Sequence, residues 1–309
     1  MALMRTTAGT LAWGLLVGLL AVPSSQASEA EWAAPCAVEV IRDLAYYEGA
    51  DAHPVKHKLD LYLPKGRKDF PVVLFVHGGA WRSGDKNYFF DVYGQVGRMF
   101  ARNGMGAVVI NYRLAPQFKH PAHIEDVARA FAWTYRNIAR YGGRPDQLFV
   151  CGHSAGGHLV ALLATDGRYL DKEKLSPDHI RGVIGISGVY AVPSGNLFNY
   201  AFGPDDEVKR QASPISHVAG NHPPFLLLYA DGDLPTLDVM AQQMADALRR
   251  CRCDVRCTVI EGRDHYSIVA RLAHDDDPTT RAVLAFIAQH TEQPLTTRPR
   301  PASHPSVRR

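Results

Sequence analysis

Short segments with the side-chain patterns of β-strands recur along the chain between residues 38 and 261. They are Val38–Tyr47, His57–Leu63, Pro71–His77, Gly106–Tyr112, Gln147–Cys151, Ile180–Ser187, Pro224–Ala230 and Val255–Glu261. The first two alternate apolar and polar residues, so we expect them to pair as an antiparallel hairpin. Pro71–His77 is a continuous apolar run, which is typical of a strand that is covered on both faces of its sheet.

Segments with helical character lie between most of these strands. The predicted helices are Tyr88–Asn103, Ile124–Tyr141, a helix that begins at Leu159, Leu237–Arg250 and Thr279–His290. Strands that alternate with helices predict a mostly parallel sheet with helices on both faces, in a single α/β domain. The segment from Val192 to Ser213 is rich in Gly, Pro, Asn and aromatic residues, and we expect a small irregular cap there.

The two ends of the chain differ from the domain between them. Arg5 precedes the apolar run Leu11–Val22, and small residues around Ala27 follow at cleavage spacing, which indicates a secretory signal peptide over residues 1–27. The apolar run is short for a membrane span, and an uncleaved anchor is the alternative. The folded domain is then predicted at residues 28–292. The Pro/Arg-rich tail at 293–309 is expected to be disordered because it cannot bury a core.

Composition narrows the class of protein. Hydrophobic residues make up 46% of the chain and charged residues 21%, which is ordinary for a soluble globular protein and excludes a disordered chain or a membrane bundle. The formal net charge of +3 is small and comes partly from the tail, so nucleic acid is not an expected partner. We expect an exported protein, periplasmic or extracellular, that keeps no membrane anchor after cleavage of the signal peptide.

Five cysteines lie beyond the predicted signal peptide. They are Cys36, Cys151, Cys251, Cys253 and Cys257. An oxidising compartment permits disulfides, and we expect at least one that involves the Cys251–Cys257 cluster, while Cys151 is expected to be buried and inert. The same cluster resembles a metal clip, but no suitably spaced histidine or fourth ligand accompanies it, so no metal site is predicted.

A small-residue turn joins the strand that ends at Cys151 to the following helix. It reads Gly152-His-Ser-Ala-Gly156 and fits the pattern G-x-S-x-G, in which a serine on a tight strand-to-helix bend is presented to an active site. The two glycines leave room where side chains would collide, and the helix directs its N-terminal N–H groups toward Ser154. The alternative interpretation is a turn that only lets helix and sheet pack closely.

Three other strands end in residues that suit a nucleophilic serine. In a mostly parallel sheet, active sites gather at the carboxyl ends of the strands. His77-Gly-Gly-Ala-Trp81 offers backbone N–H groups for an oxyanion hole, Asp231-Gly-Asp233 offers an acid, and His265 follows the last strand and offers a base. The order Ser, Asp, His along the chain is the order expected for a hydrolase of this architecture.

Together these motifs make the chain similar to an α/β-hydrolase of the His-Gly-Gly esterase group, which includes relatives of hormone-sensitive lipase, kynurenine formamidase and isoprenylcysteine methylesterase. The matching strings are His77-Gly-Gly-Ala-Trp81, Asn111-Tyr-Arg-Leu-Ala-Pro116, His120-Pro-Ala-His-Ile-Glu-Asp126, Gly152-His-Ser-Ala-Gly-Gly157 and Asp264-His265. The resemblance implies the acid role for Asp233, with Asp231 as the alternative. Here Tyr229-Ala230 stands where the group has His-Gly before its acid, and this departure weakens that assignment.

The resemblance implies a division of roles among these residues. Ser154, Asp233 and His265 are expected to form a catalytic triad. The oxyanion donors are expected to be the N–H groups of Gly79, Ala80 and Ala155. We assign substrate binding to Gly78, Trp81 and His153, and a wedge within the loop is the alternative for Trp81. Four residues of the matching strings are expected to be structural; they are Arg113, His120, His123 and Asp126.

The expected reaction is hydrolysis of small-molecule carboxylic esters through an acyl-enzyme, without a metal or organic cofactor. The short cap and the absence of a long lid helix favour short or medium acyl groups. Two alternatives stay open: an aryl-formamide hydrolase of the kynurenine formamidase kind, and a non-catalytic binding protein with the same fold. The oligomeric state does not follow from the sequence.

Overall fold

A computed structural model describes residues 35–291, apart from the side chains of residues 88–90. The predicted signal peptide at 1–27 and the predicted tail at 293–309 lie outside the described residues. Of the folded domain predicted at 28–292, the structure describes residues 35–291. In this range no helix combines the length and the apolar character needed to cross a membrane.

The described residues are organised around one eight-stranded sheet with the strand order β1-β2-β4-β3-β5-β6-β7-β8. The strands are β1 (Val38–Ala45), β2 (Lys58–Pro64), β3 (Phe70–Val76), β4 (Gly106–Ile110), β5 (Gly143–His153), β6 (Gly182–Ile186), β7 (Phe225–Gly232) and β8 (Val255–Asp264). β1 pairs with β2 as an antiparallel hairpin, and β2 is also antiparallel to β4. All the remaining pairings are parallel, as the sequence predicts.

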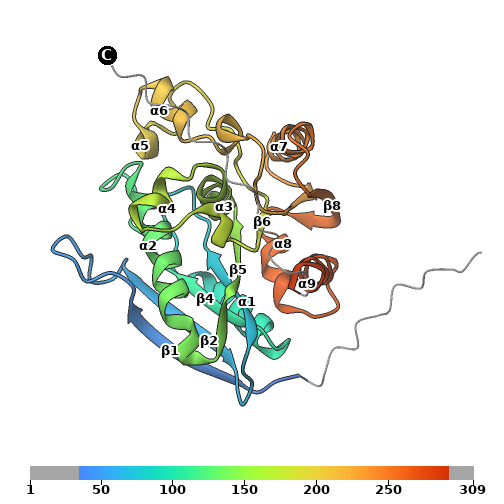
Figure 1. The fold of residues 1–309 in the computed structure, drawn as a ribbon. Helices are drawn as coiled ribbons and strands as arrows, with labels where there is room; N and C mark the ends of the chain where they lie inside the picture. Colours follow the sequence, from blue (N-terminus) through green and yellow to red (C-terminus); the bar gives the residue numbers. More distant parts are fainter. Residues whose placement is uncertain (1–34, 292–309) are drawn as a thin grey trace, which may run out of the picture. The chain divides into compact units, whose positions relative to one another are not determined.

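Helices cover both faces of the sheet (Figure 1). The α-helices are α1 (Tyr88–Arg102), α2 (Ala122–Asn137), α3 (Ala155–Thr165), α4 (Arg168–Lys172), α5 (Asn199–Phe202), α6 (Asp206–Gln211), α7 (Leu237–Arg250), α8 (Ser267–Ala270) and α9 (Pro278–Thr291). Helices α2, α3 and α7 pack into one hydrophobic core, and α1, α8 and α9 pack into a second core on the opposite face. β3 shows how the sequence supplies both cores. Leu74 and Val76 enter the first while Val73 and Phe75 enter the second, because successive side chains of a strand point to opposite faces.

Several elements differ in detail from the sequence prediction. The helix predicted over Ile124–Tyr141 ends at Asn137, and one turn of 3-10 helix, η1 (Ile138–Tyr141), follows it. β5 begins earlier than expected because Gly143 already pairs with Phe70. Helix α4 was missed because its five residues are too few to show a helical period.

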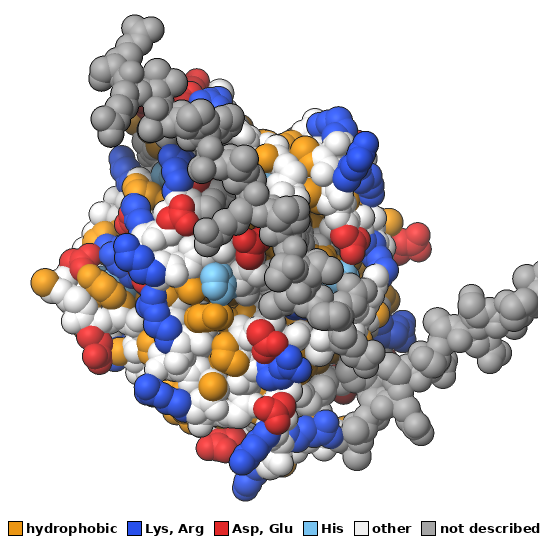
Figure 2. All heavy atoms as spheres, in the orientation of Figure 1, with side chains coloured by type: hydrophobic (Ala, Val, Ile, Leu, Met, Phe, Trp, Pro, Cys, Tyr) orange, Lys and Arg blue, Asp and Glu red, His pale blue; other side chains and the backbone are white. Residues whose placement is uncertain are grey.

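The predicted cap contains two short helices, α5 and α6. A 3-10 turn, η3 (Pro214–His217), extends it slightly beyond the expected end. On the face seen in Figure 2, lysine and arginine side chains lie among acidic and uncharged ones.

The prediction of a disulfide in the Cys251–Cys257 cluster is wrong for this structure, in which all five cysteines are free thiols. Cys253 lies in the turn after α7, and its Sγ faces the carbonyl of Ala219 at 3.8 Å. Cys257 lies on β8, where it packs against the core beneath α7. Cys151 is fully buried, as expected, and burial raises the pKa of its thiol.

The turn between β5 and α3 is packed against the neighbouring strand β3. A Cβ placed on Gly156 would overlap the carbonyl oxygen of Val76, and a Cβ on Gly152 would overlap the backbone of Gly156. Backbone atoms cannot rotate away as flexible side chains can. Both positions therefore require glycine for steric reasons, which explains the two glycines of the G-x-S-x-G pattern.

We predict that Gly156→Ala lowers the free energy of unfolding by about 1–3 kcal/mol or more, because β3 and α3 must move apart to admit the methyl group. Urea unfolding followed by circular dichroism measures the change. Gly220→Ala is a matched control, because its Cβ would meet no atom within 4 Å, and it should cause no loss. Equal stability of Gly156→Ala and the natural protein would contradict this steric account.

Candidate active site

Ser154 stands at the tip of the turn between β5 and α3. Its backbone has φ 55° and ψ −117°, a conformation that non-glycine residues rarely adopt and that concentrates at functional sites. The Ser154 N–H donates to the carbonyl of Ile186 at the end of β6, at 2.8 Å, which holds the strained turn in place. The side chain is thereby presented at the carboxyl ends of the parallel strands.

His265 and Asp233 lie in line with Ser154. The His265 Nε2 is 3.0 Å from the Ser154 Oγ, and its Nδ1 is 2.7 Å from the Asp233 Oδ1. His265 follows β8 and is only 5% exposed, while Asp233 follows β7. The structure thus brings together the three residues that the sequence predicts as a triad, from three separate strand ends.

The Asp233 carboxylate receives several hydrogen bonds besides that of His265. Its Oδ2 accepts from the Ser187 hydroxyl at 2.6 Å and from the Ala230 N–H at 3.1 Å, and its Oδ1 accepts from the Leu234 N–H at 2.9 Å. Burial by itself pushes the pKa of Asp233 upward, but the hydrogen bonds outweigh it and hold the pKa below its ordinary value. The group therefore stays ionised beside the imidazole.

Ser187 is a site residue that the sequence analysis missed. It is fully buried at the end of β6, with φ 49°, and its hydroxyl fixes the orientation of Asp233. One feature of the sequence could have revealed it. Ser187 is a polar residue at the end of the apolar strand predicted at Ile180–Ser187, so it lies at the same edge of the sheet as the other candidate site residues.

Asp231, the alternative acid, has a different environment. It is exposed, and its carboxylate accepts hydrogen bonds from the N–H groups of Gly262 at 2.9 Å and Arg263 at 3.0 Å. These bonds connect the end of β7 to the end of β8. Of the two candidate acids, the structure brings Asp233 to His265 and uses Asp231 to connect the two strands.

The loop after β3 has an unusual backbone. Gly79, Ala80 and Trp81 have φ values of 112°, 50° and 57° in succession. Within residues 35–291, the N–H groups of Gly79 and Ala80 have no hydrogen-bond partner. The loop also lies against the nucleophile turn, since a Cβ on Gly78 would be 3.1 Å from the Ser154 Cβ. Ala155, the third predicted donor, is the first residue of α3.

The assignment of Gly78 to substrate binding requires correction. Its N–H is already used, because it donates to the Tyr93 hydroxyl at 3.1 Å in a buried position. Gly78 supports the loop from below and has no free N–H to offer a substrate.

The assignment of Trp81 to substrate binding also requires correction, in favour of the alternative wedge. Its side chain is 1% exposed, and its indole N–H donates to the His158 Nδ1 at 3.2 Å. The rings of Phe198 and Phe202 in the cap pack edge-on against it. The opposite ring nitrogen of His158 lies 2.8 Å from the carbonyl of Ala212 at the end of α6.

The third assignment to substrate binding, that of His153, fails for the same reason. His153 is 4% exposed, and its Nε2 lies 2.8 Å from the backbone carbonyl oxygen of His265. Burial lowers the pKa of its imidazole to about 3. The ring therefore lies beneath the site as a neutral group. Local sequence could not reveal this, because the partner is 112 residues away.

Arg113 and Asp126 form a buried pair, in agreement with their expected structural role. The Asp126 carboxylate accepts from the Arg113 guanidinium at 2.7 Å and from the His57 Nε2 at 2.9 Å. In the described part of the chain, no group of three or more His, Cys, Asp or Glu side chains is placed to hold a metal ion.

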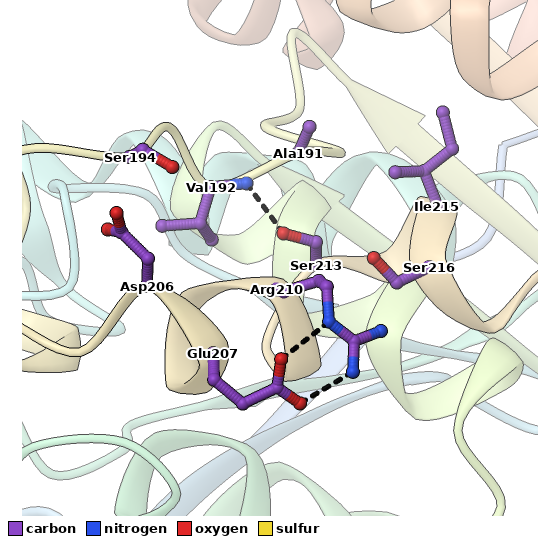
Figure 3. Close-up of a pocket in the computed structure, with 9 residues that line it drawn as sticks. All are labelled: Ala191, Val192, Ser194, Asp206, Glu207, Arg210, Ser213, Ile215 and Ser216. Carbon is purple, nitrogen blue, oxygen red and sulfur yellow. Dashed lines mark hydrogen bonds and ion pairs between the residues drawn. The ribbon is translucent and has the colours of Figure 1, made fainter.

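A pocket of about 390 Å³ lies in the cap, between the chain that follows β6 and helix α6 (Figure 3). Arg210 and Glu207 on its wall form an ion pair, with the Arg210 Nε donating to Glu207 at 2.7 Å. None of the lining residues is Ser154, Asp233 or His265. The pocket is thus lined by residues other than those of the predicted triad.

The sheet order and the helices on both faces are those of the α/β-hydrolase fold, which solved structures share. A carbohydrate esterase from gut microbiota, in truncated form, aligns with a TM-score of 0.69 and 18% identity over 82% of this chain and 97% of that one. The chain belongs to the BD-FAE family, whose model matches residues 59–244.

The chain is also similar to curated esterases and to a formamidase. Esterase LipC of Mycobacterium tuberculosis is 32% identical over 241 residues, which cover 72% of this chain and 59% of LipC. Kynurenine formamidase of Danio rerio is 27% identical over 243 residues, which cover 75% of this chain and 78% of that protein. The chain spans about half the length of three other curated relatives, with 48%, 45% and 47% of their lengths covered. The expected α/β-hydrolase fold and the resemblance to the His-Gly-Gly esterase group are confirmed.

Buried histidines make the stability of the fold depend on pH. Burial, together with the neighbouring His120, lowers the pKa of the His123 imidazole to about 4. A histidine in an unfolded chain titrates near 6.5. Between these values the unfolded chain binds a proton that the folded chain does not, so the free energy of unfolding falls as the pH is lowered, by about 1.4 kcal/mol per pH unit for such a group.

We predict that His123→Leu makes the free energy of unfolding depend less steeply on pH between pH 6.5 and pH 4.5. The slope should fall by about 1.4 kcal/mol per pH unit, which corresponds to one proton fewer taken up on unfolding. The substitution removes one group that must stay neutral in the folded protein and becomes charged on unfolding. Urea unfolding at several pH values measures the slope. An unchanged slope would show that His123 does not resist protonation in the folded protein.

Proposed function

We propose that this protein is a carboxylesterase that uses Ser154 as its nucleophile, His265 as its general base and Asp233 to orient the base. The observation that carries the proposal is the aligned pair of hydrogen bonds on His265, at 3.0 Å to the Ser154 Oγ and at 2.7 Å to the Asp233 Oδ1. A serine hydroxyl is a weak nucleophile by itself, and an adjacent base that removes its proton activates it.

In the first step, the Ser154 Oγ attacks the ester carbonyl carbon while the His265 Nε2 takes the hydroxyl proton. The carbonyl oxygen then carries the negative charge of a tetrahedral intermediate. We assign its stabilisation to the N–H groups of Gly79, Ala80 and Ala155, since the first two have no other partner in the described residues. One such donor typically contributes about 3 kcal/mol to transition-state stabilisation.

The intermediate collapses when its carbon–oxygen bond to the alcohol breaks. His265 returns its proton to the departing alkoxide, which leaves as the alcohol, and Ser154 remains acylated. A water molecule then attacks the acyl carbon while His265 takes a proton from it. Release of the carboxylic acid restores the Ser154 hydroxyl. The ionised Asp233 stabilises the imidazolium that forms in each half-reaction and keeps the Nδ1 proton in place.

Names among the relatives support ester hydrolysis as the reaction. LipC is called an esterase, and the solved structures that share the fold include esterase B of Lactobacillus rhamnosis. We infer short or medium acyl groups from the cap, whose helices α5 and α6 have four and six residues and form no long lid. Free small-molecule esters are the proposed substrates.

An aryl-formamide hydrolase is the second candidate. It is favoured by the match to kynurenine formamidase, which extends over 78% of that protein. The mechanism would be the same, with a formyl group on Ser154 and an amine as leaving group. Comparison of p-nitrophenyl acetate with N-formylkynurenine separates the two functions, and a much higher kcat/KM for the formamide would overturn the ester assignment.

We propose that the enzyme acts outside the cytoplasm, because Arg5, the apolar run Leu11–Val22 and the small residues before Ser28 have the pattern of a signal peptide. N-terminal sequencing of the protein from its native host tests this. A mature chain that begins near Ser28 is expected, and an intact Met1 would contradict export by cleavage.

We predict that a fluorophosphonate probe labels the folded protein on Ser154 and that Ser154→Ala abolishes both labelling and hydrolysis of p-nitrophenyl acetate. The probe reacts only with a serine activated by its neighbours, so it also separates an enzyme from a binding protein with the same fold. Circular dichroism of Ser154→Ala verifies that the variant is folded. If the natural protein resists the probe, the serine hydrolase proposal fails.

We predict that Asp233→Asn lowers kcat by about 10³–10⁴-fold, because the neutral amide no longer stabilises the required tautomer and the imidazolium. Asp231→Asn is the matched control. It makes the same chemical change two residues away, at a carboxylate that contacts backbone N–H groups, and it should leave kcat nearly unchanged. Steady-state kinetics decide, and a larger effect at Asp231 would move the acid role there.

A further inference from the structure

Tyr93 and His153 form a buried hydrogen-bonded chain beneath the site. The Gly78 N–H contacts the Tyr93 hydroxyl at 3.1 Å, and that hydroxyl lies 3.4 Å from the His153 Nδ1. The His153 Nε2 is 2.8 Å from the His265 carbonyl oxygen. Both side chains are nearly inaccessible, at 6% and 4% exposed.

The groups at the two ends fix the direction of every bond in this chain. The Gly78 N–H can only donate, and the His265 carbonyl can only accept. The Tyr93 oxygen therefore accepts from Gly78, which leaves its own hydrogen to point toward His153. His153 must donate from Nε2, so its Nδ1 is the acceptor. Burial supports this neutral tautomer, because it lowers the pKa of His153 to about 3.

The chain connects two parts of the site that the sequence keeps far apart. Gly78 directly precedes the proposed oxyanion donors Gly79 and Ala80, and His265 carries the proposed base. The side-chain rings of His153 and His265 are also in contact, with their centroids 4.8 Å apart. This connection is independent of the hydrogen bonds among Ser154, His265 and Asp233.

Other contacts also hold the segment around His265, and those of Asp264 follow the histidine directly. Asp264 accepts hydrogen bonds from the N–H groups of Tyr266 at 2.9 Å and Ser267 at 2.7 Å, which fixes the start of α8. Asp264 holds the chain after His265, while His153 holds the carbonyl of His265 itself. His153 thus connects the backbone of His265 to the nucleophile turn.

We propose that His153 and Tyr93 are positioning residues that set the distance between the oxyanion donors and the base. The proposal rests on the proposed function, and it assigns to the residue next to the nucleophile a task distinct from substrate contact. The hydrogen bonds of this chain go to backbone groups and do not involve the Ser154 Oγ. Both act by holding backbone groups, Gly78 at one end and His265 at the other.

Substitutions that keep volume but change hydrogen bonding test the proposal. Tyr93→Phe keeps the ring and removes the hydroxyl at the centre of the chain. His153→Leu removes both ring nitrogens, while His153→Gln keeps an N–H donor for the His265 carbonyl. Tyr62→Phe is the control, because Tyr62 is a fully buried tyrosine of the same hydrophobic core that lies outside the chain.

We expect His153→Leu and Tyr93→Phe to lower kcat for p-nitrophenyl acetate by about tenfold to 100-fold with KM nearly unchanged, since a misplacement of catalytic groups by about 1 Å can cost about 100-fold. His153→Gln should recover most of the loss, and Tyr62→Phe should match the natural protein. Unchanged kcat in folded His153→Leu, or equal losses in the Leu and Gln variants, would overturn the positioning role.

A spectroscopic readout separates this proposal from the proposed function. The proton on the His265 Nδ1, which is hydrogen-bonded to Asp233, should give a low-field ¹H NMR signal in the natural protein. We expect this signal to be lost or shifted in His153→Leu and retained in His153→Gln and Tyr62→Phe. Failure of the natural protein to hydrolyse esters would contradict the function alone, whereas an unchanged signal in folded His153→Leu would contradict the positioning role.

Discussion

The carboxyl end of β3 and the turn between β5 and α3 lie so close that no side chain fits between the Gly156 backbone and the carbonyl of Val76. This close contact determines the positions of the segments around it. Since β3 continues into the loop at Gly78–Trp81, close packing of the two strand ends brings the free N–H groups of that loop beside Ser154. Any side chain at Gly156 would separate the nucleophile from the loop. The strained backbones of Ser154 and Ala80 persist because the surrounding sheet holds both segments in place.

Few of the buried ionisable side chains at the site carry a charge. Asp233 is held ionised by four hydrogen-bond donors, including His265 and Ser187, although burial opposes its charge. The histidines beneath it, His153 and His158, are kept neutral by burial, which lowers the pKa of each to about 3. Among these imidazoles, Asp233 accepts a hydrogen bond from His265.

The sequence alone predicts the sheet, the main helices and the identity of the residues that meet at the site. Apolar runs and strand-end motifs depend on local chemistry, which a single sequence displays. The choice of Asp233 over Asp231 needed the resemblance to a family, because both follow the same strand. The tasks of Gly78, Trp81 and His153 were misassigned, since their partners come from distant segments. A motif identifies a loop as functional but does not say which of its side chains face inward. The prediction of a disulfide within the Cys251–Cys257 cluster failed because cysteine spacing carries no information on side-chain direction.

The contact of Trp81 with His158, and of His158 with Ala212, has a mechanical consequence. The indole can only donate, so His158 must accept on Nδ1 and carry its proton toward the carbonyl at the end of α6. The cap is thereby coupled to the loop of Gly79 and Ala80, and it cannot lift as an independent lid while these bonds persist. A redesign that exchanges the cap for that of another hydrolase has to provide a carbonyl acceptor at the place of Ala212. Otherwise the exchange would alter the geometry of the loop along with the shape of the entrance.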